Sequence, residues 1–256
     1  MIKFHFKFDK TKKAEKLKKK YLKLYKNYSP RSANFIIVAG GDGFMLNILK
    51  RLAKYKKPFY GINCGTFGFL MNNNVQINLE KKITKTNKVT INPLELNAIT
   101  LGNKKKTLMA INEVSLFRQS RQTASLRLIV GKKIIIKKLI SDGILISTPA
   151  GSTAYNLSVH GPILSLNSGK LAVTPISPFR PRRWKGKIIS SLSKVTVKNL
   201  DFYKRPVAAV ADNIEIRNIK FLSIKKNKKI KINLLFDTNR SLVKRIKIEQ
   251  LRKNIN

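Results

Sequence analysis

This sequence is poor in the residues that hold metals or form covalent cross-links. Its 256 positions contain one cysteine and two histidines. A single thiol, Cys64, excludes a disulfide framework, and one cysteine with two histidines leaves no plausible zinc set. No apolar run approaches the roughly 20 residues of a membrane-spanning helix, and residues 1–8 alternate basic with apolar side chains instead of building a signal-peptide core. We therefore expect a cytoplasmic protein with no membrane partner and no metal-binding set of side chains.

Acidic residues are also scarce, which gives the chain a large positive charge. Lysine and arginine total 54 against 12 aspartates and glutamates, a formal charge of +42. Taken alone, this charge favours nucleic acid or an anionic membrane surface as a partner. However, the lysines are spread along the whole chain, which indicates compositional drift and no specific nucleic-acid partner. The candidate patch, Arg180, Arg182 and Arg183 beside the lone Trp184, is explained as well by a subunit contact or a place near phosphates.

The first part of the chain has the pattern of an α/β unit. Alternating apolar residues predict an opening strand: Ile2, Phe4, Phe6 and Phe8. Apolar residues three and four apart then predict a helix over about residues 11–27 with this buried stripe: Ala14, Leu17, Tyr21, Leu24 and Tyr28. A buried strand at 35–38, a helix from Met45 and a short strand at 59–62 follow. This order favours a parallel sheet, in which ligands bind beyond the carboxyl ends of the strands.

After residue 87 the pattern changes to short β-branched segments separated by polar or glycine turns. They predict an antiparallel β-sandwich: LNAITLG, KTLMAINEVSLF, ASLRLIVGKKIIIKKL, GILIST, KVTVKNL, NIEIRNIKFLSI and KKIKINLLF. We place a Rossmann-like α/β domain at residues 1–90 and the β-sandwich domain at 91–236. Apolar residues at loosely helical spacing in residues 237–256 predict a C-terminal helix that packs back on the first domain.

The glycine-rich loop at residues 40–43 has the composition of an anion site. Three glycines let the backbone adopt positive φ and let a ligand come close, and the following helix offers unpaired N–H groups. A carboxylate in a pure phosphate cradle would repel the phosphate, so Asp42 is better explained as facing a hydroxyl or a magnesium ion beside it. The alternative is a plain strand-to-helix turn in which Asp42 is the N-cap.

Residues 139–164 form a second motif-rich stretch. A strand over 144–147 leads into a tight turn at 148–151, and Ser152 is a good N-cap for a helix that begins at Thr153. The N-terminal end of this helix presents hydroxyls, backbone amides and the ring of Tyr155. This combination suits a nucleoside better than a bare phosphate. Four acidic residues also lie beside glycine or asparagine, as expected for a ligand-lined cleft: Asp42, Glu113, Asp142 and Asp212.

Together these motifs resemble the bacterial NAD kinase family. They are GGDGF at 40–44, NE at 112–113, SDG at 141–143 and TPAGSTAYNLS at 148–158, and their order and spacing match across nearly the whole chain. GGDG alone also resembles loops of diacylglycerol and sphingosine kinases, whereas the TPAGSTAY block with NE ahead of it is far more specific. The resemblance implies transfer of the γ-phosphoryl group of ATP, with Mg²⁺ or another divalent cation, to the 2′-hydroxyl of the NAD adenosine ribose. It also implies a homodimer or homotetramer.

The resemblance implies roles for individual residues as well. Asp42 is the expected base or 2′-hydroxyl partner, and the phosphate-facing loop comprises Gly40, Gly41 and Gly43. Phe69 occupies the family's aromatic position, as either a core residue or a platform for a ring. The other expected NAD-binding residues are Asn112, Glu113, Asp142, Ala150, Thr153, Ala154, Tyr155, Asn156, Leu157 and Ser158. Asn213 departs from the glycine or histidine that relatives often carry after the aspartate, which leaves the role of Asp212 open.

Two other functions stay open at this point. A lipid kinase would share the GGDG loop, and a charge of +42 would favour an anionic membrane, but the polar aromatic stretch 148–158 makes little sense for acyl chains. A nucleic-acid module would need basic residues interleaved with exposed aromatic side chains on one face. Polyphosphate in place of ATP and NADH in place of NAD also stay open.

Overall fold

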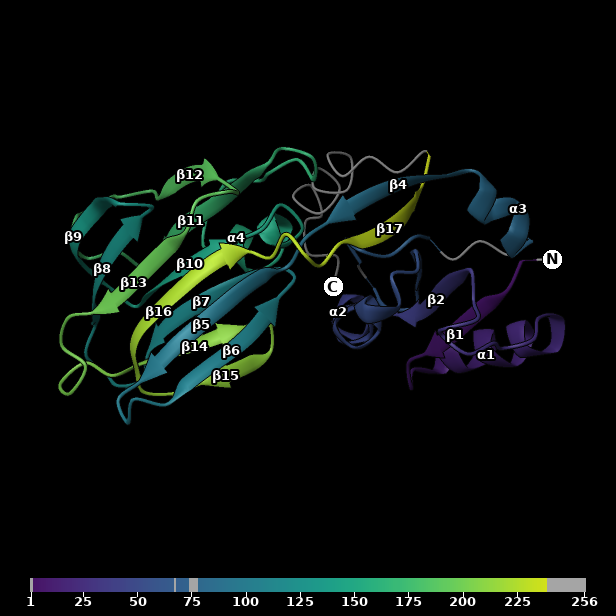
Figure 1. The fold of residues 1–256 in the computed structure, drawn as a ribbon, viewed down its shortest axis with the longest axis horizontal. Helices are drawn as coiled ribbons and strands as arrows, with labels where there is room; N and C mark the ends of the chain where they lie inside the picture. The colour runs from purple at the N-terminus through teal and green to yellow at the C-terminus, as the bar shows by residue number, and fades with distance from the viewer. Residues whose placement is uncertain (1, 67, 74–77, 239–256) are drawn as a thin grey trace, which may run out of the picture. The chain divides into compact units, whose positions relative to one another are not determined.

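The computed structural model describes residues 2–66, 68–73 and 78–238, which form two compact units (Figure 1). The first unit contains the described residues up to Ile91 and again from Ile230. The second unit runs from Asn92 to Lys229. Among the helices of the described ranges, none is long and apolar enough to cross a membrane.

The first unit is built on a five-stranded sheet with the order β1-β2-β3-β17-β4. Its strands are β1 Phe4–Phe8, β2 Phe35–Gly40, β3 Phe59–Asn63, β4 Thr86–Ile91 and β17 Ile232–Asp237. Its helices are α1 Lys12–Leu24, α2 Asp42–Leu52, the 3₁₀ turn η1 Ala53–Tyr55 and α3 Leu79–Thr84. Strands β1, β2 and β3 pair in parallel, which confirms the predicted strand–helix alternation.

Helix α1 follows its sequence pattern except at its end. Thr11 caps it, since its hydroxyl accepts a hydrogen bond from the N–H of Ala14, 3.3 Å away. The predicted burial of Leu24 is wrong, because this side chain is 63% exposed. The helix stops there, and Tyr25 continues in an extended conformation and packs edge-on against Phe4, with ring centroids 5.4 Å apart. Helical spacing no longer sets side-chain direction beyond that residue.

Strand β17 does not belong to the β-rich domain in which the sequence analysis placed it. It lies between β3 and β4 of the first unit, parallel to β3 and antiparallel to β4. Asn72 holds it in place, because its Nδ2 donates to the carbonyl of Leu235 at 2.9 Å and its Oδ1 accepts from the N–H of Asp237 at 3.0 Å. Asp237 ends this strand instead of starting a helix. The rest of the predicted tail, from residue 239, lies outside the described residues.

The second unit consists of two six-stranded sheets, ordered β12-β11-β10-β7-β14-β15 and β6-β5-β16-β13-β8-β9, and all their pairings are antiparallel. The first sheet contains β7 Glu113–Arg118, β10 Gly143–Ser147, β11 Lys170–Ile176, β12 Lys187–Ser190, β14 Val207–Ala211 and β15 Ile214–Ile216. The second contains β5 Leu94–Thr100, β6 Lys105–Ala110, β8 Ala124–Val130, β9 Lys133–Ser141, β13 Val195–Asn199 and β16 Ile219–Lys226. Between β10 and β11 lie the 3₁₀ turn η2 Gly151–Thr153 and the short helix α4 Tyr155–Ser158.

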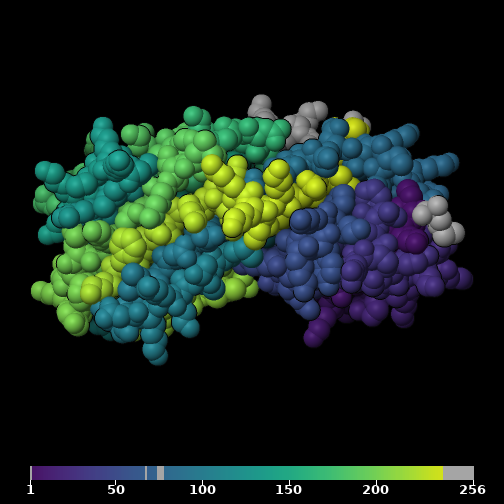
Figure 2. All heavy atoms as spheres, in the orientation of Figure 1, coloured from purple at the N-terminus to yellow at the C-terminus, as the bar shows by residue number. Residues whose placement is uncertain are grey.

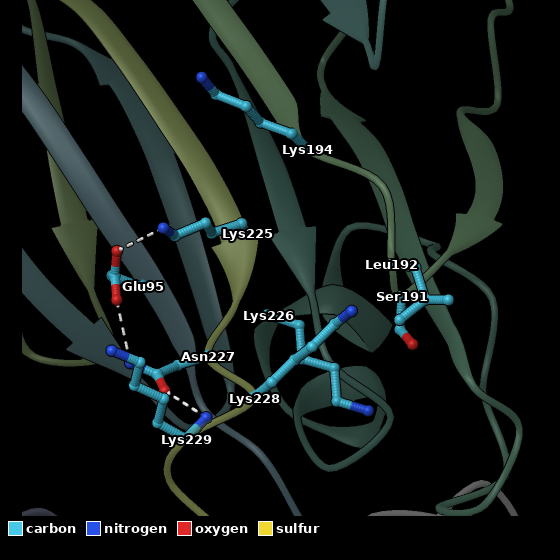
Figure 3. Close-up of a pocket in the computed structure, with 9 residues that line it drawn as sticks. All are labelled: Glu95, Ser191, Leu192, Lys194, Lys225, Lys226, Asn227, Lys228 and Lys229. Carbon is cyan, nitrogen blue, oxygen red and sulfur yellow. Dashed lines mark hydrogen bonds and ion pairs between the residues drawn. The ribbon is translucent and has the colours of Figure 1, made fainter.

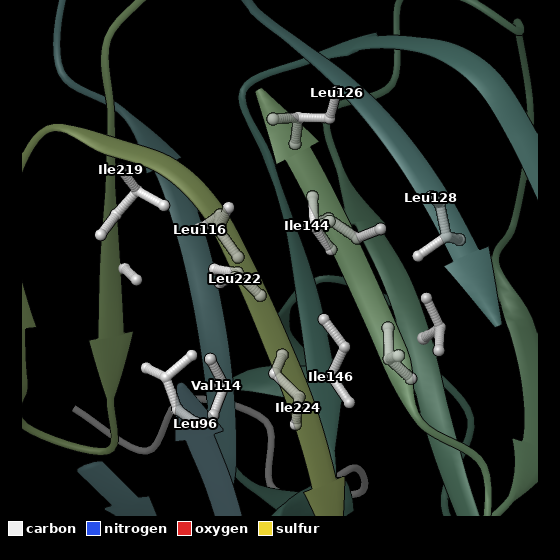
Figure 4. Packing of buried hydrophobic residues seen from close by; sticks show 14 of the residues in the cluster. Leu96, Val114, Leu116, Leu126, Leu128, Ile144, Ile146, Ile219, Leu222 and Ile224 are labelled. Atoms are coloured by element: carbon white, nitrogen blue, oxygen red, sulfur yellow. The ribbon is translucent and has the colours of Figure 1, made fainter. Parts of the chain in front are cut away.

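One apolar core joins these two sheets (Figure 4). Leu116 and Ile144 of one sheet share it with Leu96, Leu126 and Leu222 of the other, all at most 1% exposed. Burying each such side chain contributes about 1.5–3 kcal/mol to folding. The core therefore holds the edges of both sheets, and the loops at their ends, in a defined arrangement.

Candidate active site

Asp42 links the two glycine-rich turns of the first unit. It is the first residue of α2, and the N-cap position belongs to Gly41, which makes no side-chain capping bond. The Asp42 carboxylate accepts hydrogen bonds from two backbone N–H groups of the turn after β3, from Phe69 at 2.7 Å and from Leu70 at 3.0 Å. The N-cap alternative is therefore wrong. A negative charge at the start of α2 is also favourable in the field of the helix dipole.

The glycines of this loop do not use positive φ, so that part of the prediction is wrong. Strand β2 continues extended through Gly41, at φ −100° and ψ 179°, and α2 begins directly after it, so no left-handed turn is needed. Gly40 is required by packing, since a Cβ there would lie 2.7 Å from Cδ1 of Phe44. A Cβ on Gly41 or Gly43 would meet nothing within 4 Å, which leaves this face of the loop open.

The register of the second unit brings its two predicted motifs together. In the pairing of β7 with β10, Glu113 lies opposite Ser147, so the start of β7 is beside the stretch that follows β10. The Thr148 N–H donates to the carbonyl of Asn112 at 2.9 Å, and the Thr148 hydroxyl donates to that of Ile111 at 2.8 Å. A Cβ on Gly151 would lie 2.3 Å from the Asn112 carbonyl oxygen, so this glycine permits the contact.

Asp212 organises the backbone where the start of β7 meets the stretch after β10, a place we call the Asn112–Tyr155 corner. It follows β14, which pairs with β7, and has the left-handed φ of 54°. Its carboxylate accepts hydrogen bonds from three successive N–H groups, those of Ile111 at 2.9 Å, Asn112 at 2.8 Å and Glu113 at 3.3 Å. The role left open by the sequence is thus a clamp on the NE motif.

Asn112 has an unsatisfied acceptor at this corner. In the described part of the chain, its buried Oδ1 has no hydrogen-bond partner. A buried polar atom without a partner costs about 1–3 kcal/mol, and an incoming donor group removes that cost. The exocyclic amine or a hydroxyl of a nucleoside supplies such a donor.

Tyr155, Phe117 and Asp142 form the aromatic and acidic side of the corner. The rings of Tyr155 and Phe117 lie with centroids 5.7 Å apart, and the Tyr155 side chain is partly exposed. Burial of its hydroxyl, and then the nearby carboxylates of Asp142 and Glu113, raise the pKa of Tyr155 above its ordinary value. The phenol is therefore a hydrogen-bond donor throughout the neutral pH range.

Asp142 carries its own cationic partner. Arg118, at the end of β7, places Nε 2.5 Å from Oδ1 of Asp142, and its Nη1 donates to the carbonyl of Ser120 at 2.8 Å. Both side chains of the pair are about one-third exposed. Neither Arg118 nor Phe117 was identified from sequence, because only the pairing of β7 with β10 brings them beside the SDG and GSTAY motifs.

Other residues of the 148–158 stretch use their polar groups in hydrogen bonds within the protein. The predicted helix capped by Ser152 is wrong: the Ser152 hydroxyl is buried, donates to the Pro149 carbonyl at 2.7 Å and accepts from the N–H of Leu164 at 3.0 Å. Asn156 is fully buried, accepts from the Thr174 hydroxyl at 2.7 Å and donates to the Pro162 carbonyl at 2.9 Å. Its side chain is thereby committed to the protein. The short helix α4 has Ala154 as its N-cap.

The remaining predicted residues of this stretch differ in accessibility. Ala150 and Thr153 are buried, Ala154 and Leu157 are half-buried, and Ser158 is exposed. In the first unit, Phe69 is half-buried. This burial does not decide between a core residue and a platform for a ring, so both alternatives remain predictions. Within residues 2–66, 68–73 and 78–238, no three His, Cys, Asp or Glu side chains gather as a metal-binding cluster.

Comparisons with known proteins agree over most of the chain. Residues 2–91 match the family model of the ATP-NAD kinase N-terminal domain, and residues 111–229 match that of the ATP-NAD kinase C-terminal domain. The NAD kinase of Zymomonas mobilis is 46% identical over 244 residues, covering 94% of this chain and 95% of the relative. That of Caulobacter vibrioides is 42% identical over 245 residues, covering 96% and 94%.

Solved structures with the same fold are more distant in sequence. An NAD kinase from Archaeoglobus fulgidus in complex with ATP superposes with a TM-score of 0.74 at 22% identity, covering 97% of both chains. Yeast NADH kinase complexed with NADH gives a TM-score of 0.73 at 21% identity, covering 88% of this chain and 68% of the other.

Proposed function

This chain belongs to the ATP-NAD kinase family, and we propose that Asp42 and the Asn112–Tyr155 corner carry its activity. That activity is the phosphorylation of the 2′-hydroxyl of the NAD adenosine ribose with ATP, giving NADP. The observation that supports the Asn112–Tyr155 corner is the buried Oδ1 of Asn112, which has no hydrogen-bond partner among the described residues. The same corner also contains the ring and the phenolic donor of Tyr155. The lipid-kinase and nucleic-acid alternatives receive no support from the comparisons.

Asp42 is the group we propose to act on the ribose hydroxyl. An alcohol is a poor nucleophile at neutral pH, so a carboxylate that orients the hydroxyl and accepts its proton assists the transfer. The N–H groups of Phe69 and Leu70 keep this carboxylate in one orientation at the start of α2. The open face of the loop at Gly41 and Gly43 supports an approach of phosphate groups to the backbone.

The corner at Asn112 is the part we propose to hold adenosine. Asn112 Oδ1 accepts from a donor of the nucleoside, and Tyr155 offers its ring face and its hydroxyl. Asp212 holds the backbone from Ile111 to Glu113 in place through three hydrogen bonds. Asp142, paired with Arg118, is assigned to the nicotinamide end. Asn156, whose side chain is used within the protein, acts in this proposal as a support for the stretch.

The residues present fit a magnesium ion held largely by substrate. Mg²⁺ in phosphotransferases is commonly bound through one or two carboxylates together with substrate phosphates and water. The described chain offers the carboxylate of Asp42 beside the open loop and no cluster of three ligands, which is that kind of donor set. When bound, the ion supplies neutralisation of phosphate charge. The homodimer or homotetramer and the cytoplasmic location stay predictions.

One assay tests the activity directly. Purified protein with ATP, magnesium and NAD is expected to form NADP, measured with an NADP-specific dehydrogenase. The control omits ATP, and a second control replaces ATP by polyphosphate. No NADP above the reaction without enzyme would contradict the activity, whereas NADP formed only with polyphosphate would correct the donor.

A further inference from the structure

A cavity lined by lysines lies in the second unit, built from residues outside the proposed kinase site. Its volume is about 500 Å³. It is lined by Glu95, Ser191, Leu192, Lys194, Lys225, Lys226, Asn227, Lys228 and Lys229 (Figure 3). They come from the start of β5, the connection between β12 and β13, and the end of β16 with the residues after it. Strand β16 lies at the surface beside β5, yellow next to blue-green in Figure 2.

The single acidic residue of this cavity is already satisfied from within the protein. Glu95 Oε1 lies 3.2 Å from Nζ of Lys225 and accepts from Nδ2 of Asn97 at 3.1 Å, and its Oε2 accepts from Nδ2 of Asn227 at 2.9 Å. The hydrogen bonds from Asn97 and Lys225 hold the pKa of Glu95 below its ordinary value. Glu95 thus neutralises Lys225 and has no charge left for the other lysines.

Among the described residues, the four other lysines have no anionic partner. In the described ranges, none of Lys194, Lys226, Lys228 or Lys229 forms an ion pair with a carboxylate of the protein. These four lysine side chains line one cavity, and the repulsion between their positive charges is relieved when an anion binds among them. The ammonium group of lysine is a common ligand for phosphate oxygens.

The lining also indicates what kind of anion fits. None of the described residues that line the cavity is aromatic, so they offer no platform on which a base could stack. The cavity volume is that of a small-molecule site. A single phosphate carries at most about two negative charges, fewer than four unpaired lysines accommodate. We propose that this cavity binds a small, non-aromatic polyanion with several linked phosphate groups, at a site separate from the kinase residues.

Inorganic tripolyphosphate is the probe for this site. Isothermal titration at about 0.15 M salt compares wild type with a cavity variant, K194Q/K226Q/K228Q/K229Q. The matched control is K104Q/K105Q/K106Q/K132Q, which removes four exposed lysines of the same unit outside the cavity and changes the net charge equally. A milder variant, K228Q/K229Q, changes only two exposed lysines and guards against loss of folding in the fourfold variant.

We expect tripolyphosphate to bind saturably, with one site assigned to the cavity. Its affinity for that site should fall at least tenfold in the cavity variant and less than threefold in the control. Melting temperatures and NADP formation should match wild type in all variants, and orthophosphate should bind at least tenfold more weakly than tripolyphosphate. Equal losses in the cavity and control variants would reduce the effect to diffuse surface charge and overturn the proposal. Single-stranded DNA is titrated in parallel. If only the cavity variant loses binding to this DNA while its binding of tripolyphosphate is unchanged, the proposal is also overturned. Because the titration does not depend on turnover, its outcome is independent of whether NADP forms.

Discussion

The carboxylate of Asp212 lies 2.8 Å from the backbone nitrogen of Asn112, although the two residues are 100 positions apart in the chain. The same carboxylate binds the N–H groups on either side of Asn112. Asp212 thereby sets the direction of the backbone from which the Asn112 side chain projects. In the proposed site, Asp212 is therefore a positioning residue that acts through Asn112.

Replacing Asp212 by Asn should weaken NAD binding more than turnover. The amide keeps one acceptor oxygen for three N–H donors, and each donor left unsatisfied costs about 1–3 kcal/mol. We expect the KM for NAD to rise about tenfold, kcat to change less, and the melting temperature to fall by a few degrees. Asp201→Asn is the control, because it changes the net charge equally. The Asp201 carboxylate binds Arg205 and the backbone of Lys204. An unchanged KM in Asp212→Asn would leave the clamp with a purely structural role.

Replacing Asp42 by Asn should act mainly on kcat. Asn keeps the size of the side chain and one acceptor for the Phe69 or Leu70 N–H, but removes the charge that accepts a proton. We expect kcat to fall by about 10²-fold or more, as for loss of a general base, with a smaller change in the KM for NAD. Asp9→Asn is the control: it removes the charge of a side chain whose Cβ lies beside Gly40, and its activity should stay close to wild type. Activity of Asp42→Asn within a few fold of wild type would remove Asp42 from the mechanism.

Tyr155 and Asn112 should show coupled effects on NAD binding. Tyr155→Ala and Asn112→Ala are each expected to raise the KM for NAD by an amount equivalent to about 1–3 kcal/mol, and the double variant should lose less than the sum. Tyr155→Phe separates the ring from the hydroxyl, since it keeps the contact with Phe117. Tyr203→Ala, at a tyrosine that is 84% exposed in the same unit, is the control. A lower melting temperature with an unchanged KM would make Tyr155 a packing residue only.

His5 should make the protein less stable in mild acid. Its Nδ1 donates to the Tyr28 carbonyl at 2.7 Å, and its Nε2 is buried without a partner in the described structure. Burial, opposed by the hydrogen bond to Tyr28 and assisted by the charge of Lys7, lowers the pKa of His5 below 6.5. The unfolded chain therefore binds the proton more readily, so this contribution to stability is present above about pH 6.5 and is lost as the pH falls through the folded pKa.

The His5→Asn variant tests this pH dependence, because the Asn amide can keep the donor to Tyr28 and does not titrate. Melting temperatures measured from pH 7.5 to 5 should fall more steeply for wild type than for His5→Asn. The other histidine, His160, is exposed and has a left-handed φ of 60°, which Asn adopts readily, so His160→Asn is the control and should follow the wild-type slope. Identical slopes in wild type and His5→Asn would assign the acid sensitivity to other groups.

Local sequence pattern determined much of this protein. The run Phe35–Val38 followed by Gly40–Gly43 and helical spacing identifies β2, its loop and α2, because buried strands and amphipathic helices differ in side-chain period. The alternating segments after residue 93 identify most strands of the second unit for the same reason. The motifs GGDG, NE and TPAGSTAY, read in order, led to the family to which the chain belongs.

Only the tertiary structure decided which of these elements meet. Strand β17 reads like its β-rich neighbours, but backbone pairing with β3 and β4 assigns it to the first unit. Ser152 and Asn156 have the composition of ligand contacts, yet their polar atoms are used to hold Leu164, Thr174 and Pro162. Asp142 gains Arg118, and Asn112 gains Asp212, through strand register. The spacing of apolar side chains is set within one segment of the chain. The partner of a side chain is instead set by contacts between segments far apart in the chain, and no local pattern encodes those contacts.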